Sequence, residues 1–165
     1  LMAYTTPSID TTAQSLGMAI LLFARHPEQW RLIRDDHTLI PAAYSEILRY
    51  ETPLHFFTRT VQREYRVEGE DVPMGSRIAV LFASANRDER RWPDADRFDI
   101  RRNPTEQLAF GHGIHSCTGQ GMARLEAHAV LAALARHVDR FDIGEPSYRL
   151  NNNLRSLKSL PVTVR

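Results

Sequence analysis

The only cysteine of this chain, Cys117, lies inside the stretch FGHGIHSCTGQGMARLE, residues 110–126. Four glycines surround it, at positions 111, 113, 119 and 121. A helix-like pattern follows at once. The first amides of a helix have no internal partner, and together with the helix dipole they favour negative charge. A cysteine at this position is therefore favoured as a thiolate, which is either a nucleophile or a soft metal ligand.

The glycines bear on which of the two roles applies. Gly111 and Gly113 can take backbone angles closed to other residues, and they leave no side chain to keep a flat ligand away. Gly119 is expected to allow close packing against the first helical turn. A nucleophilic cysteine would need a base oriented beside it. His115 is the nearest candidate, but the loop supplies no obvious partner to orient it. A haem iron needs only the thiolate, an uncrowded loop and cations for its propionates.

Two plainer interpretations of the cysteine stay open at this point. A single cysteine is most often a small buried hydrophobic residue. A zinc site built from His112, His115 and Cys117 is also conceivable, although it lacks a visible fourth ligand and the usual paired-cysteine spacing.

Composition places the chain among soluble globular proteins. Hydrophobic residues make up 42% of the 165 residues and charged residues 25%, which is ordinary for about one domain. The net charge of +1 gives no argument for a nucleic acid or an anionic membrane as partner. No apolar run reaches the ~20 residues of a membrane span, and no signal peptide is visible. A single cysteine excludes an internal disulfide, which fits the cytoplasm.

Hydrophobic periodicity predicts a mainly α fold with a small β portion. Helices are expected at residues 9–24, from Pro27 onward, at 39–50 and at 118–138. Residues 82–92 are also helix-like. Strand-like runs punctuated by glycine and proline suggest a small mixed sheet. The expected regions are helices over 1–51, the small sheet over 53–82, an irregular loop carrying the cysteine over 83–117, the helix 118–138 and strands over 139–165.

The cysteine loop resembles the haem-binding signature of the cytochromes P-450, the haem–thiolate monooxygenases. The matching residues are Phe110, Gly111, Gly113, His115, Cys117 and Gly119. The resemblance covers essentially the whole chain, which corresponds to only the C-terminal part of a family member of the soluble bacterial type. It implies that Cys117 is the proximal ligand of the iron of haem b. It also implies that Phe110 packs near the sulfur and that His115 hydrogen-bonds a propionate.

The same resemblance assigns a proton-delivery role near the start of the chain. Asp10 and Thr11 match the acid–alcohol pair that delivers protons during dioxygen activation. The family commonly has a small residue and a glycine before the acid, where this chain has Pro7 and Ser8. Proline either opens the helix by removing an N–H or ends it there.

Further matches concern support of the loop and of the cofactor. Glu46 and Arg49 match the family's Glu-x-x-Arg motif, with Arg97 as the expected third partner. Their role would be structural, because a buried carboxylate between two guanidiniums is satisfied by paired hydrogen bonds. Arg59 matches a position whose guanidinium binds a haem propionate.

A last set of matches concerns the substrate. The residues expected to line its pocket are Leu54, His55, Phe56, Phe57 and Leu154. They suggest an apolar or aromatic substrate.

The resemblance implies an enzyme that inserts one atom of dioxygen into a small organic substrate, with electrons from a ferredoxin-type donor. The alternative is a non-catalytic fragment, haem-binding or haem-free, whose exposed apolar surface favours self-association. A third hypothesis is a hydrolase that uses Cys117 as nucleophile with His115 as its base.

Overall fold

The computed structural model describes the backbone of residues 2–165 and the side chains of residue 7 and residues 9–165. Its helical elements are α1 (Met2–Arg25), α2 (Pro27–Asp35), η1 (His37–Leu39), α3 (Ile40–Tyr50), α4 (Phe82–Ala85), η2 (Gly113–His115) and α5 (Gln120–His137). Its strands are β1 (Phe56–Thr60), β2 (Tyr65–Val67), β3 (Glu70–Val72), β4 (Arg77–Leu81), β5 (Phe141–Ile143), β6 (Ser147–Arg149), β7 (Ser156–Ser159) and β8 (Val162–Val164). The predicted class, mainly α with a small β portion, is confirmed.

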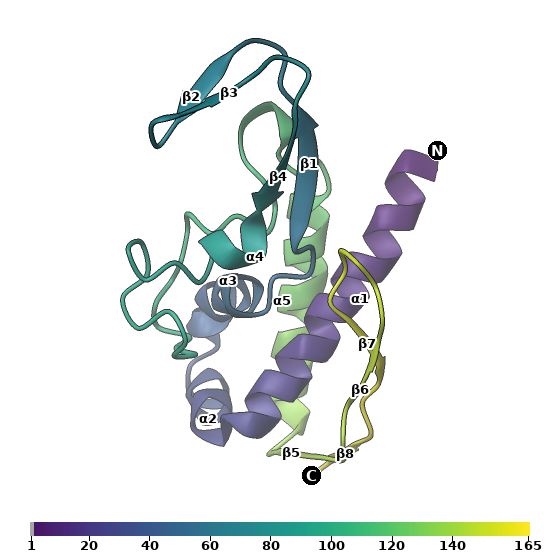
Figure 1. The fold of residues 1–165 in the computed structure, drawn as a ribbon. Helices are drawn as coiled ribbons and strands as arrows, with labels where there is room; N and C mark the ends of the chain where they lie inside the picture. The colour runs from purple at the N-terminus through teal and green to yellow at the C-terminus, as the bar shows by residue number, and fades with distance from the viewer. Residues whose placement is uncertain (1) are drawn as a thin grey trace.

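The core forms where the four longer helices meet. In Figure 1, α1 crosses in front of α5, with α3 and α2 on one side. The apolar spacing of each helix places its buried side chains at this junction. Trp30 of α2 stacks against Phe23 at 5.0 Å and Phe141 at 4.9 Å between ring centroids, and its indole N–H donates to the Val138 carbonyl at 3.1 Å. The end of α5 is thereby fixed to the helices that precede it.

The strands form antiparallel pairs and not the mixed sheet that the sequence suggested. β1 pairs with β4, and the β2–β3 hairpin lies between them in the chain. β5 pairs with β8 and β6 with β7, and Figure 1 shows β6 and β7 running alongside α1. An isolated bridge between Leu54 and Leu154 joins the two β regions.

The helix-like stretch after β4 forms only the single turn α4. It ends because Asn86 is engaged in tertiary contacts. The Asn86 carbonyl accepts a hydrogen bond from Arg49, and its side-chain oxygen accepts one from the Leu108 backbone N–H at 2.8 Å. Contacts distant in sequence override the local helical tendency here.

No helix in the described part of the chain combines the length and the apolar character that crossing a bilayer requires.

His128 of α5 is the one histidine whose burial has a clear electrostatic effect among the described residues. Its ring meets the ring of Tyr44 edge-on at 5.9 Å, and its Nε2 is buried with no hydrogen-bond partner in the described structure. Burial lowers the pKa of His128, and the positive charge of Arg124 lowers it further. The unfolded chain therefore takes up this proton at a higher pH than the folded chain does.

We expect the free energy of unfolding to fall as the pH drops below about 6.5, the ordinary pKa of histidine, because protonation then favours the unfolded state. Urea unfolding between pH 8 and pH 5 measures this slope. His128→Leu should reduce the slope, whereas His137→Leu, at an exposed position of the same helix, should leave it unchanged. An unchanged slope in the His128 variant would show that other groups govern the pH dependence.

Candidate functional site

A cavity of about 450 Å³ lies between α1, α3, the start of β1 and the cysteine loop. This volume falls within the roughly 300–1,000 Å³ typical of ligand and cofactor sites. Nine of the residues singled out in the sequence line it: Thr11, Leu54, Phe57, Arg59, Phe110, Gly111, His115, Cys117 and Gly119. The structure therefore brings together residues that are more than 100 positions apart in the chain.

The cysteine loop is folded by its own backbone. The Cys117 N–H donates to the Phe110 carbonyl at 2.8 Å, and the Ser116 N–H donates to Gly113 at 3.0 Å. The loop turns so sharply at Gly111 that a Cβ there would lie 3.1 Å from the His115 carbonyl oxygen, and its φ is +71°. Glycine is therefore required at 111 for two separate reasons. The result is an exposed Cys117 thiol on the cavity wall, just before α5.

Gly119 lies at the junction of the cysteine loop and α5. It is the N-cap of α5, and a Cβ at this position would meet only the Cys117 Sγ, at 3.9 Å. That distance is an ordinary van der Waals contact, so the described residues show no steric demand for glycine here. Gly113 has φ +66° and open space around it, so its conformation, not crowding, favours glycine.

Phe110 is held by a residue that the sequence reasoning missed. The guanidinium of Arg124 lies 5.0 Å from the centroid of the Phe110 ring, and it donates to the Ser45 hydroxyl at 3.3 Å. This contact links the cysteine loop to α3 through α5. The sequence signal that could have pointed to it is an arginine two turns or less after the cysteine, on the helix that the cysteine loop leads into.

Two side chains that can donate hydrogen bonds to an anion, those of Arg59 and His115, line the cavity. Arg59 extends from β1 and is half-buried, and one of its N–H groups donates to the Thr58 carbonyl at 2.9 Å. In the described part of the chain, no carboxylate pairs with Arg59. His115 lies on the cysteine loop and is exposed. Together they give one region of the cavity the ability to bind anionic oxygens.

Of the acid–alcohol pair, the structure places only the alcohol in the cavity. The Thr11 hydroxyl donates to the Pro7 carbonyl at 2.7 Å, and Thr11 lines the cavity. Asp10, its neighbour, is exposed and does not line it. Successive residues of a helix point in different directions, which explains the separation.

Pro7 does not end α1, which continues through it from Met2. Because proline has no N–H, it cannot donate to the carbonyl of residue 3, and the regular helical hydrogen bonding is interrupted there. The side chain of Ser8 lies outside the described residues.

A pair of hydroxyls forms another polar part of the wall. Ser15 of α1 and Tyr44 of α3 both line the cavity, and their oxygens lie 3.0 Å apart. When Ser15 donates its only proton to the Thr12 carbonyl at 2.8 Å, Tyr44 must donate to Ser15. Burial raises the pKa of Tyr44, so the phenol stays neutral.

The residues expected to line a substrate pocket divide according to strand alternation. Phe57 and Arg59, two positions apart in β1, both reach the cavity, whereas Phe56 does not. Leu54 lines the cavity directly. His55 and Leu154 do not, although Leu154 supports Leu54 through the bridge between them.

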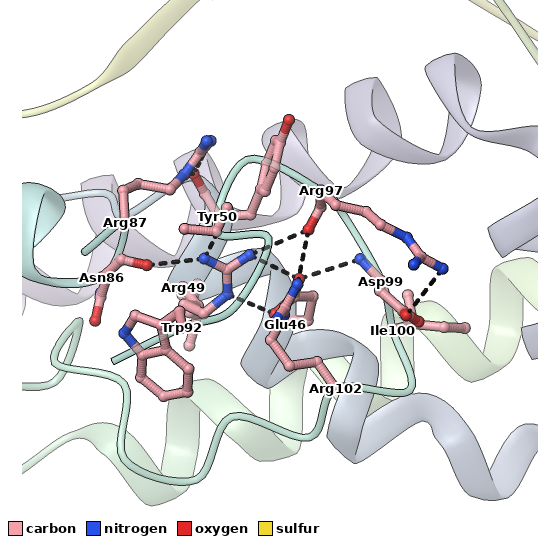
Figure 2. A network of polar contacts seen from close by, with 12 residues as sticks. Glu46, Arg49, Tyr50, Asn86, Arg87, Trp92, Arg97, Asp99, Ile100 and Arg102 are labelled. Carbon is pink, nitrogen blue, oxygen red and sulfur yellow. Dashed lines mark hydrogen bonds and ion pairs between the residues drawn. The ribbon is translucent and has the colours of Figure 1, made fainter. Parts of the chain in front are cut away.

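The Glu46–Arg49 pair is completely buried at the end of α3, and Figure 2 shows it at the centre of a polar network. Arg49 uses all five of its N–H groups. Two hydrogen bonds go to the Glu46 carboxylate at 2.7 and 2.9 Å, and three go to the carbonyls of Asn86, Ala95 and Arg97. Because α3 supplies both charges and the loop supplies the carbonyls, the pair fixes the loop 86–102 to the helix.

Arg102, not Arg97, supplies the second guanidinium at Glu46. Its Nε lies 3.3 Å from the Glu46 carboxylate, and its side chain is 16% exposed. The Arg97 side chain is 66% exposed and pairs with Asp99 at 3.4 Å, pointing away from Glu46 in Figure 2. Arg97 contributes through its backbone carbonyl, which both Arg49 and Arg102 contact at 3.3 Å.

The exposed Cys117 thiol is not the small buried hydrophobic residue that a single cysteine most often is. The described geometry also favours neither the zinc site nor the nucleophile. In the described part of the chain, no three His, Cys, Asp or Glu side chains lie close enough to hold a metal ion, which argues against a zinc site. A nucleophile and its base need a hydrogen bond between them. The side chains of His115 and Cys117 are both exposed, and no such bond joins them.

Three arginine variants separate these roles by their effect on stability. We expect Arg49→Leu to lower the free energy of unfolding by about 3–5 kcal/mol, because it leaves the Glu46 charge buried and uncompensated. Arg102→Ala should cost about 1–3 kcal/mol through the loss of charge-assisted hydrogen bonds. Arg97→Ala should have a much smaller effect because its side chain is largely exposed. Urea unfolding measures all three.

An equal loss in the Arg97 and Arg102 variants would contradict the assignment of Arg102 to Glu46. Arg90→Ala, which removes an exposed guanidinium from its pair with Asp88, serves as the control and should lower the unfolding midpoint much less than Arg102→Ala.

Comparison with known proteins agrees with this site. The family model for cytochrome P-450 matches residues 2–147. The chain is 42% identical over 157 residues to cytochrome P-450 CYP199A2 of Rhodopseudomonas palustris, covering 94% of this chain and 38% of that protein. It is 32% identical to linalool 8-monooxygenase of Pseudomonas putida, again covering 94% of this chain and 38% of that protein.

A solved structure shows the same fold. The crystal structure of P-450BioI in complex with an acyl carrier protein ligated to hexadec-9Z-enoic acid superimposes with a TM-score of 0.91 at 34% identity, covering 94% of this chain and 41% of that one. The chain thus spans well under half the length of these relatives. The resemblance seen in the cysteine loop is confirmed, and the chain belongs to the cytochrome P-450 family.

Proposed function

We propose that this chain binds haem b in the 450 Å³ cavity, with Cys117 as the axial thiolate, as part of a monooxygenase. The observation that carries the proposal is the position of the exposed Cys117 thiol on a cavity wall that Arg59 and His115 also border. Family membership implies a haem cofactor, and the donor set of this cavity matches one: a soft sulfur ligand, an apolar interior and cationic groups for carboxylates.

The roles of the individual residues follow from their positions. Gly111 keeps the loop beside Cys117 free of side-chain bulk, and we infer that Phe110, which Arg124 holds in the lining of the same cavity, lies beside the bound sulfur. An apolar ring beside a thiolate limits solvent access to the sulfur. Arg59 and His115 bind the carboxylate groups of the cofactor. Glu46, Arg49 and Arg102 maintain the loop that leads to the cysteine.

When bound, the haem supplies the one-electron and dioxygen chemistry that the side chains lack. The contribution of this chain to that chemistry is the placement of protons. The Thr11 hydroxyl is positioned on the cavity wall by its hydrogen bond to Pro7. Asp10, exposed beside it, is the group that exchanges protons with solvent.

Substrate and partners follow from the cavity and from the relatives. Leu54 and Phe57 present apolar surface, so we infer a small apolar or aromatic substrate. One relative, of Mycobacterium bovis, is named a β-dihydromenaquinone-9 omega-hydroxylase, and another, of Pseudomonas putida, a linalool 8-monooxygenase. We further propose a ferredoxin-type electron donor and a cytoplasmic location.

A second candidate is a non-catalytic fragment that associates with itself. Met122 and Leu125 of α5 are 60% and 65% exposed, although both are large apolar side chains. Such a surface favours association. Size-exclusion chromatography with light scattering separates a monomer from a self-associated form.

Haem titration of the purified chain tests the main proposal. We expect stoichiometric uptake and, after reduction under carbon monoxide, a red-shifted Soret band typical of thiolate ligation. Cys117→Ala should abolish that band, whereas His112→Ala, in the same loop but outside the cavity lining, should preserve it. Arg59→Ala should weaken haem binding by about tenfold, the equivalent of one charge-assisted hydrogen bond.

A spectrum unchanged by Cys117→Ala would exclude the thiolate assignment. Failure to take up haem at all would favour the non-catalytic fragment.

A further inference from the structure

Gln14 of α1 holds both backbone polar groups of a single residue in strand β7. Its Oε1 accepts a hydrogen bond from the Leu157 N–H at 2.6 Å, and its Nε2 donates to the Leu157 carbonyl at 3.4 Å. β7 pairs with β6 on its other side, where Leu157 lies opposite Tyr148. The Gln14 amide therefore takes the place of a neighbouring strand at the free edge of β7.

The approach of α1 to β7 is close at the next turn of the helix as well. A Cβ at Gly17 would lie 3.1 Å from the Leu157 Cδ1, so this side chain packs directly over the glycine. In the described part of the chain, Gln14 makes the only side-chain hydrogen bonds between α1 and β7. The described contacts that hold β7 against α1 therefore include this one amide and the packing of Leu157 over Gly17.

The residues just before β7 hold the cavity wall. The Asn153 carbonyl accepts from the His55 N–H at 2.8 Å, and its side-chain oxygen accepts from the Phe56 N–H at 3.1 Å. The Arg155 N–H donates to the Pro53 carbonyl at 2.8 Å. Residues 53–56 are thus fixed to residues 153–155 by backbone and amide contacts.

These contacts connect two opposite parts of the same cavity. Leu54 and Phe57 flank the two residues that Asn153 holds, and both line the cavity on the β1 side. Thr11, three residues before Gln14, lines it on the α1 side. Since residues three apart lie on one face of a helix, Gln14 and Thr11 move together. Gln14, β7 and Asn153 therefore form one continuous path of contacts between the helix that carries Thr11 and the apolar wall.

We propose that Gln14 is a positioning residue that sets the shape of the substrate end of the cavity, by fixing the wall of Leu54 and Phe57 relative to α1. The role of Gln14 in substrate selection rests on the proposed function. The structural connection between Gln14 and the wall of Leu54 and Phe57 does not require haem. The described hydrogen bonds of the Gln14 amide go to Leu157 and not to the wall residues, so its effect reaches them through β7 and Asn153.

Amide hydrogen exchange of the 165-residue chain tests the link. In Gln14→Leu, the Leu157, His55 and Phe56 amides should exchange about tenfold faster, as expected for the loss of backbone hydrogen bonds at a strand edge. Gln14→Glu keeps the acceptor for the Leu157 N–H and should restore much of the protection. Gln29→Leu is the matched control, because it removes a glutamine oxygen that accepts from the Ile100 N–H at 3.0 Å. It should affect Ile100 and leave His55 and Phe56 unchanged.

Faster exchange at Leu157 alone, with His55 and Phe56 unchanged, would overturn the proposal, because the contact would then be local. A uniform increase that includes the buried amides of α3 would also overturn it, because Gln14 would then contribute only to global stability.

A second arm uses the haem-loaded chain and imidazoles with alkyl tails of increasing length, followed through the Soret shift. Gln14→Leu should change the affinity ratio between long and short tails by about fivefold or more, while unsubstituted imidazole binds as before. An equal change for every tail length would contradict a role in cavity shape. Absence of haem uptake would defeat the proposed function and leave the exchange result to decide the link.

Discussion

The buried pair of Glu46 and Arg49 is the interaction on which the site depends. Both side chains are fully removed from solvent, and such charges are tolerated only when every polar group is satisfied. Arg49 meets this condition with five hydrogen bonds, three of them to carbonyls of the loop 86–102. Through Asn86, which accepts from Arg49 and holds the Leu108 N–H, the constraint extends to within two residues of Phe110. The position of Cys117 is thereby linked to α3.

Much of this arrangement could be predicted from the sequence. The glycine pattern around Cys117 identifies the loop, because other residues rarely adopt the positive φ of residue 111. Apolar spacing identifies the long helices, and alternation in β1 explains why Phe57 and Arg59 share the cavity. The family resemblance placed Thr11, Arg59 and His115 in one site, and the fold brings all three to one cavity.

The rest depends on contacts that local patterns do not encode. Arg97 and Arg102 are close in sequence, and only the path of the loop decides which guanidinium reaches Glu46. Asp10 is adjacent to Thr11, yet the helical rotation turns it to solvent. A glutamine at position 14 is an ordinary residue for a helix, and its hydrogen-bond partner, Leu157, lies 143 residues away in the sequence. In each case the deciding information is the packing of segments distant in sequence.

Helix α5 carries apolar side chains on more than one of its faces. Ala127 and Leu131 are buried against the core, while Met122, Leu125 and Val130 are exposed on other faces of the helix. A helix that is apolar on more than one side is typical of one covered on more than one side. The chain spans 38% of the length of the relatives to which it was compared by sequence, so the activity of the whole protein is a proposal that rests on the site described.

The central claim is that the sulfur of Cys117, held by this network, is a ligand of the haem iron. Iron-edge X-ray absorption of the chain after haem loading tests it most directly, because the scattering identifies the atoms bound to the metal. We predict a sulfur atom among the atoms bound to the iron, in addition to the four ring nitrogens. A coordination sphere of nitrogen and oxygen alone, in protein whose cysteine is intact and unmodified, would contradict it.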